Sequence, residues 1–311
     1  MPDTPAAPLP EPIPAGDPKL KLVDSIKDAL RTLPAYFAST TTIEGLEAGD
    51  LFSLNTVLGG AIEVQVVETL NRIRGVWDPD EEWTEYRFER SAQTFPDVRL
   101  ISRQGGAITC AVGIELKGWY LLAKEKEPSF RYAVTPDACA VHDLLVVVPW
   151  HLKNVLSGTP VVKEPLILQA RYAALYRNHW WQHVRNTTLD TTIVHPAGAA
   201  PYPDAKAEIS DKPAADGGGN FGRVARIGLM DDWTTSAVSQ RVVGISAQHW
   251  IDFLKAYAET SDPDQVAARV AALVERTVKA AKKAKAPLTE ADAERMHELM
   301  TELARFFDTT T

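Results

Sequence analysis

The chain has 311 residues, of which 45% are hydrophobic and 24% are charged, and its formal net charge is −8 at pH 7. This length suffices for one large or two modest domains with a core, and the acidic balance excludes a protein that coats DNA nonspecifically, because such binding needs many basic residues. No run approaches the ~18 apolar residues of a membrane helix and the N-terminus lacks the order of a signal peptide, so we expect a cytoplasmic protein without a membrane partner.

Prolines are concentrated at the N-terminus, where residues 1–18 are predicted to form a disordered tail. We expect residues 19–245 to form the main domain, which includes a flexible loop at about 196–222. Residues 246–311 are predicted to form a helical C-terminal extension.

The first predicted helix spans residues 60–74. Its apolar residues recur at helical spacing: Ile62, Val66, Leu70 and Ile73. On a helical wheel Glu63 falls inside this stripe, whereas Glu68 lies on the wet side. A carboxylate pointed at a core costs several kcal/mol, on the order of 2–7, unless it is paired or metal-bound. Glu63 is therefore either a site residue or one partner of a buried salt bridge, with Arg74 or Arg99 as its partner.

Two strands of a hairpin are predicted next, at residues 98–101 and 107–117, around the turn at 103–106. In the second strand the alternation places one set of apolar side chains on one face: Ile108, Cys110, Val112, Ile114 and Leu116. The other face carries small side chains and ends in Glu115 and Lys117. A helix on the apolar face would complete the core, and the small face leaves room for a ligand.

Asp97 follows Pro96 directly, and the Glu115-x-Lys117 pair follows Asp97 after the hairpin turn. Two carboxylates, a phosphate oxygen and several waters are sufficient ligands for Mg²⁺, which prefers oxygen. A lysine two residues from Glu115 on the same strand face can hydrogen-bond both a water and a phosphate. The spacing therefore predicts a site for phosphodiester hydrolysis, and the alternative is a surface strand that ends in an ordinary Glu/Lys pair.

The helix with inward Glu63, the Pro96-Asp97 step and Glu115-x-Lys117 together resemble the PD-(D/E)xK nuclease superfamily, and within it the type II restriction endonucleases. The resemblance covers roughly residues 50–185. It implies an α/β core with a central mixed β-sheet flanked by helices, Mg²⁺ dependence, and cleavage of double-stranded DNA that leaves a 5′-phosphate. It also implies that Asp97 and Glu115 are the metal ligands, Lys117 the water-orienting lysine and Glu63 the accessory acid.

Basic residues outnumber acidic ones between residues 118 and 189, in a chain that is acidic overall. Lys124, Lys126 and Arg131 follow directly after the predicted catalytic strand. A loop at this place is positioned to contact DNA phosphates beside the cut. The alternative is a solvated loop of alternating Lys and Glu.

Residues 144–148 form an apolar run ended by Pro149, which predicts a central strand buried on both faces. Residues 165–181 are then predicted to be helical. Within that helix, Gln169 resembles the polar residue that helps some relatives fix the site, and we assign it to DNA binding.

His179 and His183 stand four residues apart, a spacing that can hold a metal ion. No Glu follows His179 in a His-Glu-x-x-His pattern and no third ligand is evident. We therefore interpret them as helix-end histidines packed among Trp180 and Trp181.

The loop at 196–222 is rich in Pro, Ala and Gly, and Arg223 and Arg226 follow it. It is not a Walker loop, because no Gly-Lys-Ser/Thr follows. We predict a DNA-facing loop that orders on binding, with both arginines in contact with DNA. The alternative is a linker to the C-terminal part.

The C-terminal extension carries a capping-box pattern at residues 288–292, followed by a helical apolar stripe. These helices either pack on the core or form a dimer contact. Two cysteines make no zinc framework, so Cys110 and Cys139 are predicted to be buried thiols in a reducing cytoplasm.

We expect a Mg²⁺-dependent, sequence-specific endodeoxyribonuclease of a restriction-modification system. A two-fold homodimer is the simplest way to present one active site to each strand of a symmetric DNA site. A cognate DNA methyltransferase belongs to such a system, though not as a bound subunit. Two alternatives stay open: a structure-specific repair or recombination nuclease of the same fold, and a catalytically inert DNA-binding or scaffold protein.

Overall fold

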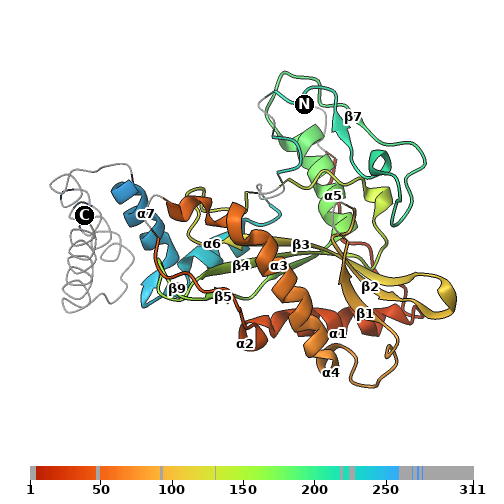
Figure 1. The fold of residues 1–311 in the computed structure, drawn as a ribbon. Coiled ribbons are helices and arrows are strands. Elements are labelled where there is room, and N and C mark those ends of the chain that lie inside the picture. The colour runs from red at the N-terminus through yellow and green to blue at the C-terminus, as the bar shows by residue number, and fades with distance from the viewer. Residues whose placement is uncertain are drawn as a thin grey trace.

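A computed structural model describes residues 5–46, 50–91, 94–129, 131–217, 220–223 and 228–258, with the single positions 268, 272 and 275 (Figure 1). Its helices are α1 (Lys19–Arg31), α2 (Leu33–Tyr36), α3 (Leu54–Arg72), α4 (Arg74–Trp77), α5 (Ala170–His179), α6 (Asp231–Ser239) and α7 (Ala247–Ala258). Its strands are β1 (Arg87–Arg90), β2 (Val98–Ser102), β3 (Thr109–Tyr120), β4 (Leu144–Leu152), β5 (Pro160–Val162), β6 (Leu166–Gln169), β7 (Ile193–Val194), β8 (Lys212–Pro213), β9 (Arg241–Val242) and β10 (Ile245–Ser246). Short helical turns are η1 (Asp50–Ser53), η2 (Gln104–Gly106), η3 (Pro136–Ala138), η4 (Trp180–Val184) and η5 (Lys206–Glu208).

The chain is an α/β protein built around a mixed sheet, as predicted. The strand order is β1-β2-β3-β4-β5, and β6 pairs with the same strand, β4, as β5 does. The pair β3–β4 is parallel, whereas the other pairs of this sheet are antiparallel. In Figure 1 the helices α1 and α4 lie on one side of the sheet and α5 on the other. The two long central strands are therefore covered by helices.

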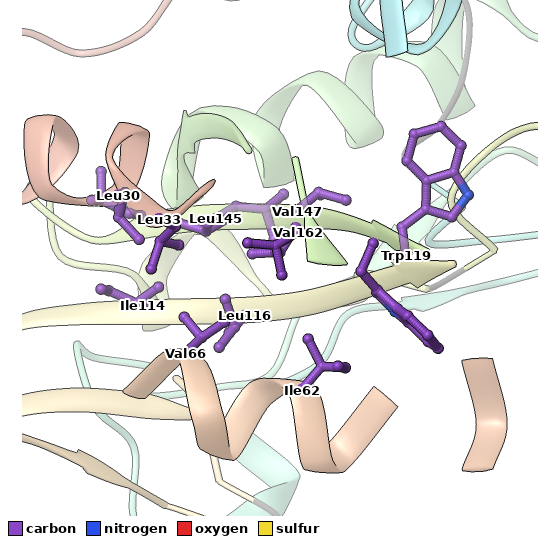
Figure 2. Packing of buried hydrophobic residues seen from close by; sticks show 14 of the residues in the cluster. Leu30, Leu33, Ile62, Val66, Ile114, Leu116, Trp119, Leu145, Val147 and Val162 are labelled. Carbon is purple, nitrogen blue, oxygen red and sulfur yellow. The ribbon is translucent and has the colours of Figure 1, made fainter. Parts of the chain in front are cut away.

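The core forms where α3 packs on β3. The predicted apolar stripe is buried, and Ile62 and Val66 point toward Ile114 and Leu116 (Figure 2). Burial of each such side chain contributes about 1.5–3 kcal/mol. The helix begins at Leu54, before the predicted start at residue 60, because its first turns are also buried against the sheet at Leu54 and Leu58.

The predicted hairpin is confirmed, with β2 antiparallel to β3 around the turn at η2. The predicted face of β3 is wrong at its start, because a bulge interrupts the register: Leu100 faces Val112, whereas Ile101 faces Cys110. An extra residue shifts the alternation, so Cys110 lies on the opposite face from Val112 and is half-buried. Ile108 precedes the strand and is 62% exposed.

The central strand β4 is buried along its whole length, as predicted, but it continues beyond Pro149 to Leu152. Proline has no backbone N–H, so the strand lacks one hydrogen-bond donor at Pro149. The carbonyl of Pro149 still accepts a hydrogen bond from the Lys163 backbone N–H. The predicted helix at 165–181 is wrong in its first turn. Residues 166–169 form a strand instead, because β5 pairs with only the end of β4 and leaves residues 144–147 free to pair with this apolar run.

The described part of the proline-rich segment differs from the predicted disordered tail. The backbone of Glu11 exchanges two hydrogen bonds with the Gln169 side chain, of 2.9 and 2.8 Å, and Ile13 packs on the core. A side-chain amide offers both a donor and an acceptor, so it can fix an extended backbone as a strand would.

The loop at 196–222 is held at several described points, in contrast to the predicted flexible loop. The Tyr202 hydroxyl donates to Asp143 at 2.8 Å, and β8 in this loop pairs with β7. Loop backbone is fixed wherever buried polar partners exist. The capping box at 288–292 lies outside the described residues.

In the predicted C-terminal extension, α7 is helical and packs Trp250, Ile251 and Leu254 into the main hydrophobic core. Among the described residues, none of the helices is both long enough and apolar enough to cross a membrane. The main domain therefore shares its core with the beginning of the extension.

A buried histidine in β4 makes stability depend on pH. His151 is 5% exposed; its Nδ1 bonds to the Leu152 carbonyl, and its Nε2 has no partner among the described residues. Burial lowers the pKa of His151 below 6.5. As pH falls below 6.5, the unfolded chain therefore binds a proton at His151 more readily than the native state does. The contribution of neutral His151 to the free energy of unfolding is present at high pH and is lost as pH falls below 6.5.

We expect the unfolding free energy of wild type, relative to His151→Gln, to decrease as pH falls from 8 toward 5. Urea unfolding of both proteins at several pH values measures this difference. Parallel pH profiles for the two proteins would contradict the assignment.

Candidate functional site

The candidate site lies where β2 separates from β3. The two strands pair from Ser102↔Thr109 to Val98↔Ile114, so the residue before Val98 stands beside the residue after Ile114. These are Asp97 and Glu115. Lys117 lies two residues further along β3, and alternation in the strand directs it to the same face as Glu115.

Lys117 joins the two carboxylates. Its Nζ lies 3.0 Å from Oδ2 of Asp97 and 2.8 Å from Oε1 of Glu115. The second oxygen of Glu115, Oε2, accepts the Asp97 backbone N–H at 3.3 Å. Three residues predicted from their spacing are thus in mutual contact.

Glu63 lies at the same place, as the helical wheel predicts. Its side chain is 18% exposed, and its charge interacts with those of Lys117 and Asp97. Its direct partner is Arg90, whose Nη2 lies 3.2 Å from Oε2. The proposed alternative partners Arg74 and Arg99 bond elsewhere: Arg74 pairs with Asp78, and Arg99 donates to the Phe95 carbonyl.

The electrostatics of the cluster favour a protonated lysine. Burial alone lowers the pKa of Lys117, but the charges of Glu115 and Asp97 outweigh burial and raise it above its ordinary value. Burial raises the pKa of the Glu115 carboxyl in spite of the neighbouring ammonium group. Burial likewise raises the pKa of Glu63. Lys117 is therefore a hydrogen-bond donor at neutral pH, and the buried acids would gain from a further cation.

The donor set fits Mg²⁺. Asp97 and Glu115 present oxygens to one point, now filled by the Lys117 ammonium, and Mg²⁺ needs only one or two carboxylates when phosphate and water complete its shell. Within the described part of the chain, three or more His, Cys, Asp or Glu side chains nowhere gather into a metal-holding group. A Mg²⁺ ion bound here would thus need a substrate phosphate and water molecules as its remaining ligands.

A further acid, which the sequence analysis did not single out, supports β3. Asp143 is fully buried; its Oδ1 accepts the Gly113 backbone N–H at 2.7 Å and the Tyr202 hydroxyl, and its Oδ2 accepts the Ala140 N–H. A Cβ at Gly113 would lie 2.8 Å from Oδ1 of Asp143 and would clash with Cγ of Pro96. Gly113 is therefore required where the Pro96-Asp97 step crosses β3.

We expect Gly113→Ala to lower the unfolding free energy by about 1–3 kcal/mol, the usual cost of overpacking. Because Pro96 must move, Asp97 would also be displaced from Lys117. Gly118→Ala on the same strand is the matched control, since its Cβ would meet its nearest atoms at an ordinary 3.6 Å. Urea unfolding tests the prediction, and equal losses for both variants would contradict it.

Of the residues predicted to bind DNA, Lys126 and Arg223 are engaged in ion pairs. Lys126 pairs with Asp252 at 2.5 Å, and Arg223 pairs with Glu127 at 2.6 Å. Arg131 is exposed and its backbone bridges to that of Arg223, while Lys124 is also exposed. The structure thus brings Arg131 and Arg223 together, though neither contacts the Lys117 cluster through a described bond.

Gln169 does not occupy the position assigned to it. It lies at the end of β6, before α5, and donates to the carbonyls of Val141 and Glu11. Its amide fixes the N-terminal segment, so its predicted place inside a helix is wrong, and its contact with DNA stays a prediction. Arg226 lies outside the described residues.

The rings of His179 and His183 lie next to each other at the end of α5, with centroids 5.3 Å apart and planes tilted by 49°. The helix continues there as one π-helical turn, η4, which contains Trp180 and Trp181. Burial and the neighbouring His183 lower the pKa of His179.

Arg90 is the site residue that sequence reasoning missed. It ends β1, a four-residue strand with three charged side chains and Phe88, which is too short to stand out in the sequence. The pairing Arg90↔Val98 places it beside Asp97. With one apolar residue among its four, this strand has no repeat by which the sequence could have identified it.

Comparisons with known proteins add no family to this geometry. No family model matches the chain, and searches of curated proteins and of solved structures returned no match. The site must therefore be interpreted from its own residues.

Proposed function

We propose that the chain is a Mg²⁺-dependent endodeoxyribonuclease of the restriction type. The observation that carries this proposal is the position of Lys117, which bridges Asp97 and Glu115 beside Glu63. The mixed sheet and the helix α3 also agree with the core that the PD-(D/E)xK resemblance implies. The intact set of four side chains argues against an inert scaffold.

Asp97 and Glu115 are the proposed Mg²⁺ ligands. When bound, Mg²⁺ would supply a Lewis acid that polarises the phosphoryl group and favours ionisation of the attacking water. The Lys117 ammonium would donate hydrogen bonds to the attacking water and to a phosphate oxygen, and so hold both in line. Its raised pKa makes it a donor rather than a general base. Glu63, paired with Arg90, would keep this arrangement in place as the accessory acid.

The substrate is double-stranded DNA, and a two-fold homodimer would present one such site to each strand. A methyltransferase of the same system would protect the host DNA without forming part of this enzyme. The free thiols Cys110 and Cys139 fit a reducing cytoplasm.

The test is to incubate the purified chain with mixed plasmid and phage DNA, with Mg²⁺ or with EDTA, and to sequence the ends. The proposal expects discrete, Mg²⁺-dependent fragments that share one short sequence at their 5′-phosphate ends. Cleavage confined to flaps, nicks or junctions would favour the repair nuclease instead. Intact DNA under all conditions would favour the inert binding protein.

A further inference from the structure

A tyrosine in the loop at 196–222 reaches the strand β3. The Tyr202 hydroxyl donates a hydrogen bond of 2.8 Å to Oδ1 of Asp143, and the Cys110 thiol of β3 also interacts with this hydroxyl. The Tyr202 backbone N–H donates to the Ala138 carbonyl at 3.3 Å. This loop residue is therefore held at both its side chain and its backbone.

The first connection from Tyr202 to Asp97 runs through Asp143. The same Oδ1 atom that accepts the Tyr202 hydroxyl also accepts the Gly113 backbone N–H at 2.7 Å. Pro96 packs directly on Gly113, since a Cβ at that position would clash with Cγ of Pro96. Asp97 is the next residue in the chain, so a shift of Asp143 would move β3 against the Pro96-Asp97 step.

The second connection runs through Arg99. Its Cζ lies 5.5 Å from the centroid of the Tyr202 ring, and its Nη2 donates to the Phe95 carbonyl at 2.7 Å. A guanidinium within about 6 Å of the centre of an aromatic face is attracted to the ring. Phe95 lies two residues before Asp97, so Tyr202 acts on this short segment through its ring as well as through its hydroxyl.

The backbone of Tyr202 is in an unfavourable conformation. Its φ is 62°, in the left-handed region that residues other than glycine rarely adopt. Pro203 follows, and a residue before proline is further restricted toward extended conformations. Such a conformation costs free energy, persists only where surrounding contacts hold it, and is most often found at functional sites. The contacts of Tyr202 with Asp143, Arg99 and Ala138 supply this support.

We propose that Tyr202 is a positioning residue that couples the loop at 196–222 to Asp97 and thereby sets the Mg²⁺ affinity of the candidate site. Because this coupling acts on the same site, it rests on the proposed function, in which Asp97 is a Mg²⁺ ligand. Movement of the loop, for instance when DNA binds beside it, would release Asp143 and Arg99 together. Asp97 would then shift relative to Lys117, and the site would hold the metal ion less tightly.

The Mg²⁺ requirement of DNA cleavage tests this coupling. Tyr202→Phe removes the hydroxyl and keeps the ring, and Tyr36→Phe, at an exposed position in α2, is the matched control. We expect Tyr202→Phe to raise the Mg²⁺ concentration that gives half of the maximal cleavage rate by about tenfold. This is the lower limit of the roughly 10–100-fold losses that are usual when a group supporting a metal ligand is removed. Tyr36→Phe should keep the wild-type value.

Backbone hydrogen exchange, measured without DNA or metal, tests the coupling independently of cleavage. Segments that contain Asp97 and Gly113 should exchange about fivefold faster in Tyr202→Phe than in wild type, the effect of one lost hydrogen bond. Tyr36→Phe should exchange at these segments as wild type does.

An unchanged Mg²⁺ requirement in Tyr202→Phe would overturn the inference, and a lower maximal rate with that unchanged requirement would show a merely structural role. Equal exchange in Tyr202→Phe and wild type would also overturn it, whether or not the chain cuts DNA. If wild type leaves DNA intact while Tyr202→Phe exchanges faster, the nuclease proposal fails and the coupling of Tyr202 to Asp97 is supported. The two failures are therefore distinguishable.

Discussion

Replacement of Lys117 by Met is expected to slow DNA cleavage by at least about 100-fold, because removal of one well-placed donor to a developing charge commonly costs 10²–10³ in rate. Lys117 is the cation that contacts both Asp97 and Glu115. Met retains the length and the apolar stem of Lys, and the loss therefore reports the ammonium group. The measurement is the rate of plasmid linearisation with saturating Mg²⁺.

Lys153→Met is the matched control, since Lys153 is exposed in the turn after β4. It should cut at the wild-type rate. Thermal unfolding of both variants must show a cooperative transition, because loss of Lys117 also removes a partner of the buried Glu115. Equal cleavage by Lys117→Met and wild type would refute the site assignment.

The second large effect is expected at the buried pair Arg177–Asp211. Arg177 is 2% exposed and Asp211 is fully buried, and Arg177 also donates to the carbonyls of Tyr132 and Val134 at 2.9 and 3.0 Å. Arg177→Met would leave the buried Asp211 carboxylate without its arginine, with His195 and Asn178 as its remaining hydrogen-bond partners. We expect the unfolding free energy to fall by about 3–5 kcal/mol, the usual cost of breaking a buried ion pair from one side.

Urea unfolding of Arg177→Met, Asp211→Asn and the double variant completes a thermodynamic cycle. The double variant should lose less than the sum of the two single losses, because it leaves no buried charge without its partner. Arg131→Met, at an exposed position, should change stability little. Additive losses would show that the charges do not interact.

Local periodicity made much of the fold predictable. The helix around Ile62 and Val66 and the buried strand at 144–148 each carry a repeat that depends on neighbours in sequence alone. A tight turn joins the two strands, so Asp97 and Glu115 could be expected near each other, although the bulge shifts their register by one residue.

Features set by distant parts of the chain could not be predicted in this way. The bulge opposite Leu100 and Ile101 reverses the face of Cys110, and no residue type announces it. Residues 166–169 have an apolar pattern that suits a helix or a strand. They form a strand because they hydrogen-bond to the free edge of β4. Arg90 reaches Glu63 only through the pairing of β1 with β2.

The incorrect placement of Gln169 within a helix has the same origin. A polar residue expected on a helix, facing the site, instead holds the backbone of Glu11, which lies far away in the sequence. Polar contacts between residues far apart in the chain produce no repeating pattern in the sequence. They determine which of several polar side chains are free to bind a ligand.

The most direct test of the nuclease proposal is the conversion of supercoiled plasmid to nicked or linear DNA by the purified wild-type chain. We expect conversion with Mg²⁺, none with EDTA, and recovery when Mg²⁺ is added in excess over EDTA. Cleavage that persists in EDTA, or a folded protein that leaves a broad mixture of plasmid and phage DNA intact with Mg²⁺, would contradict it.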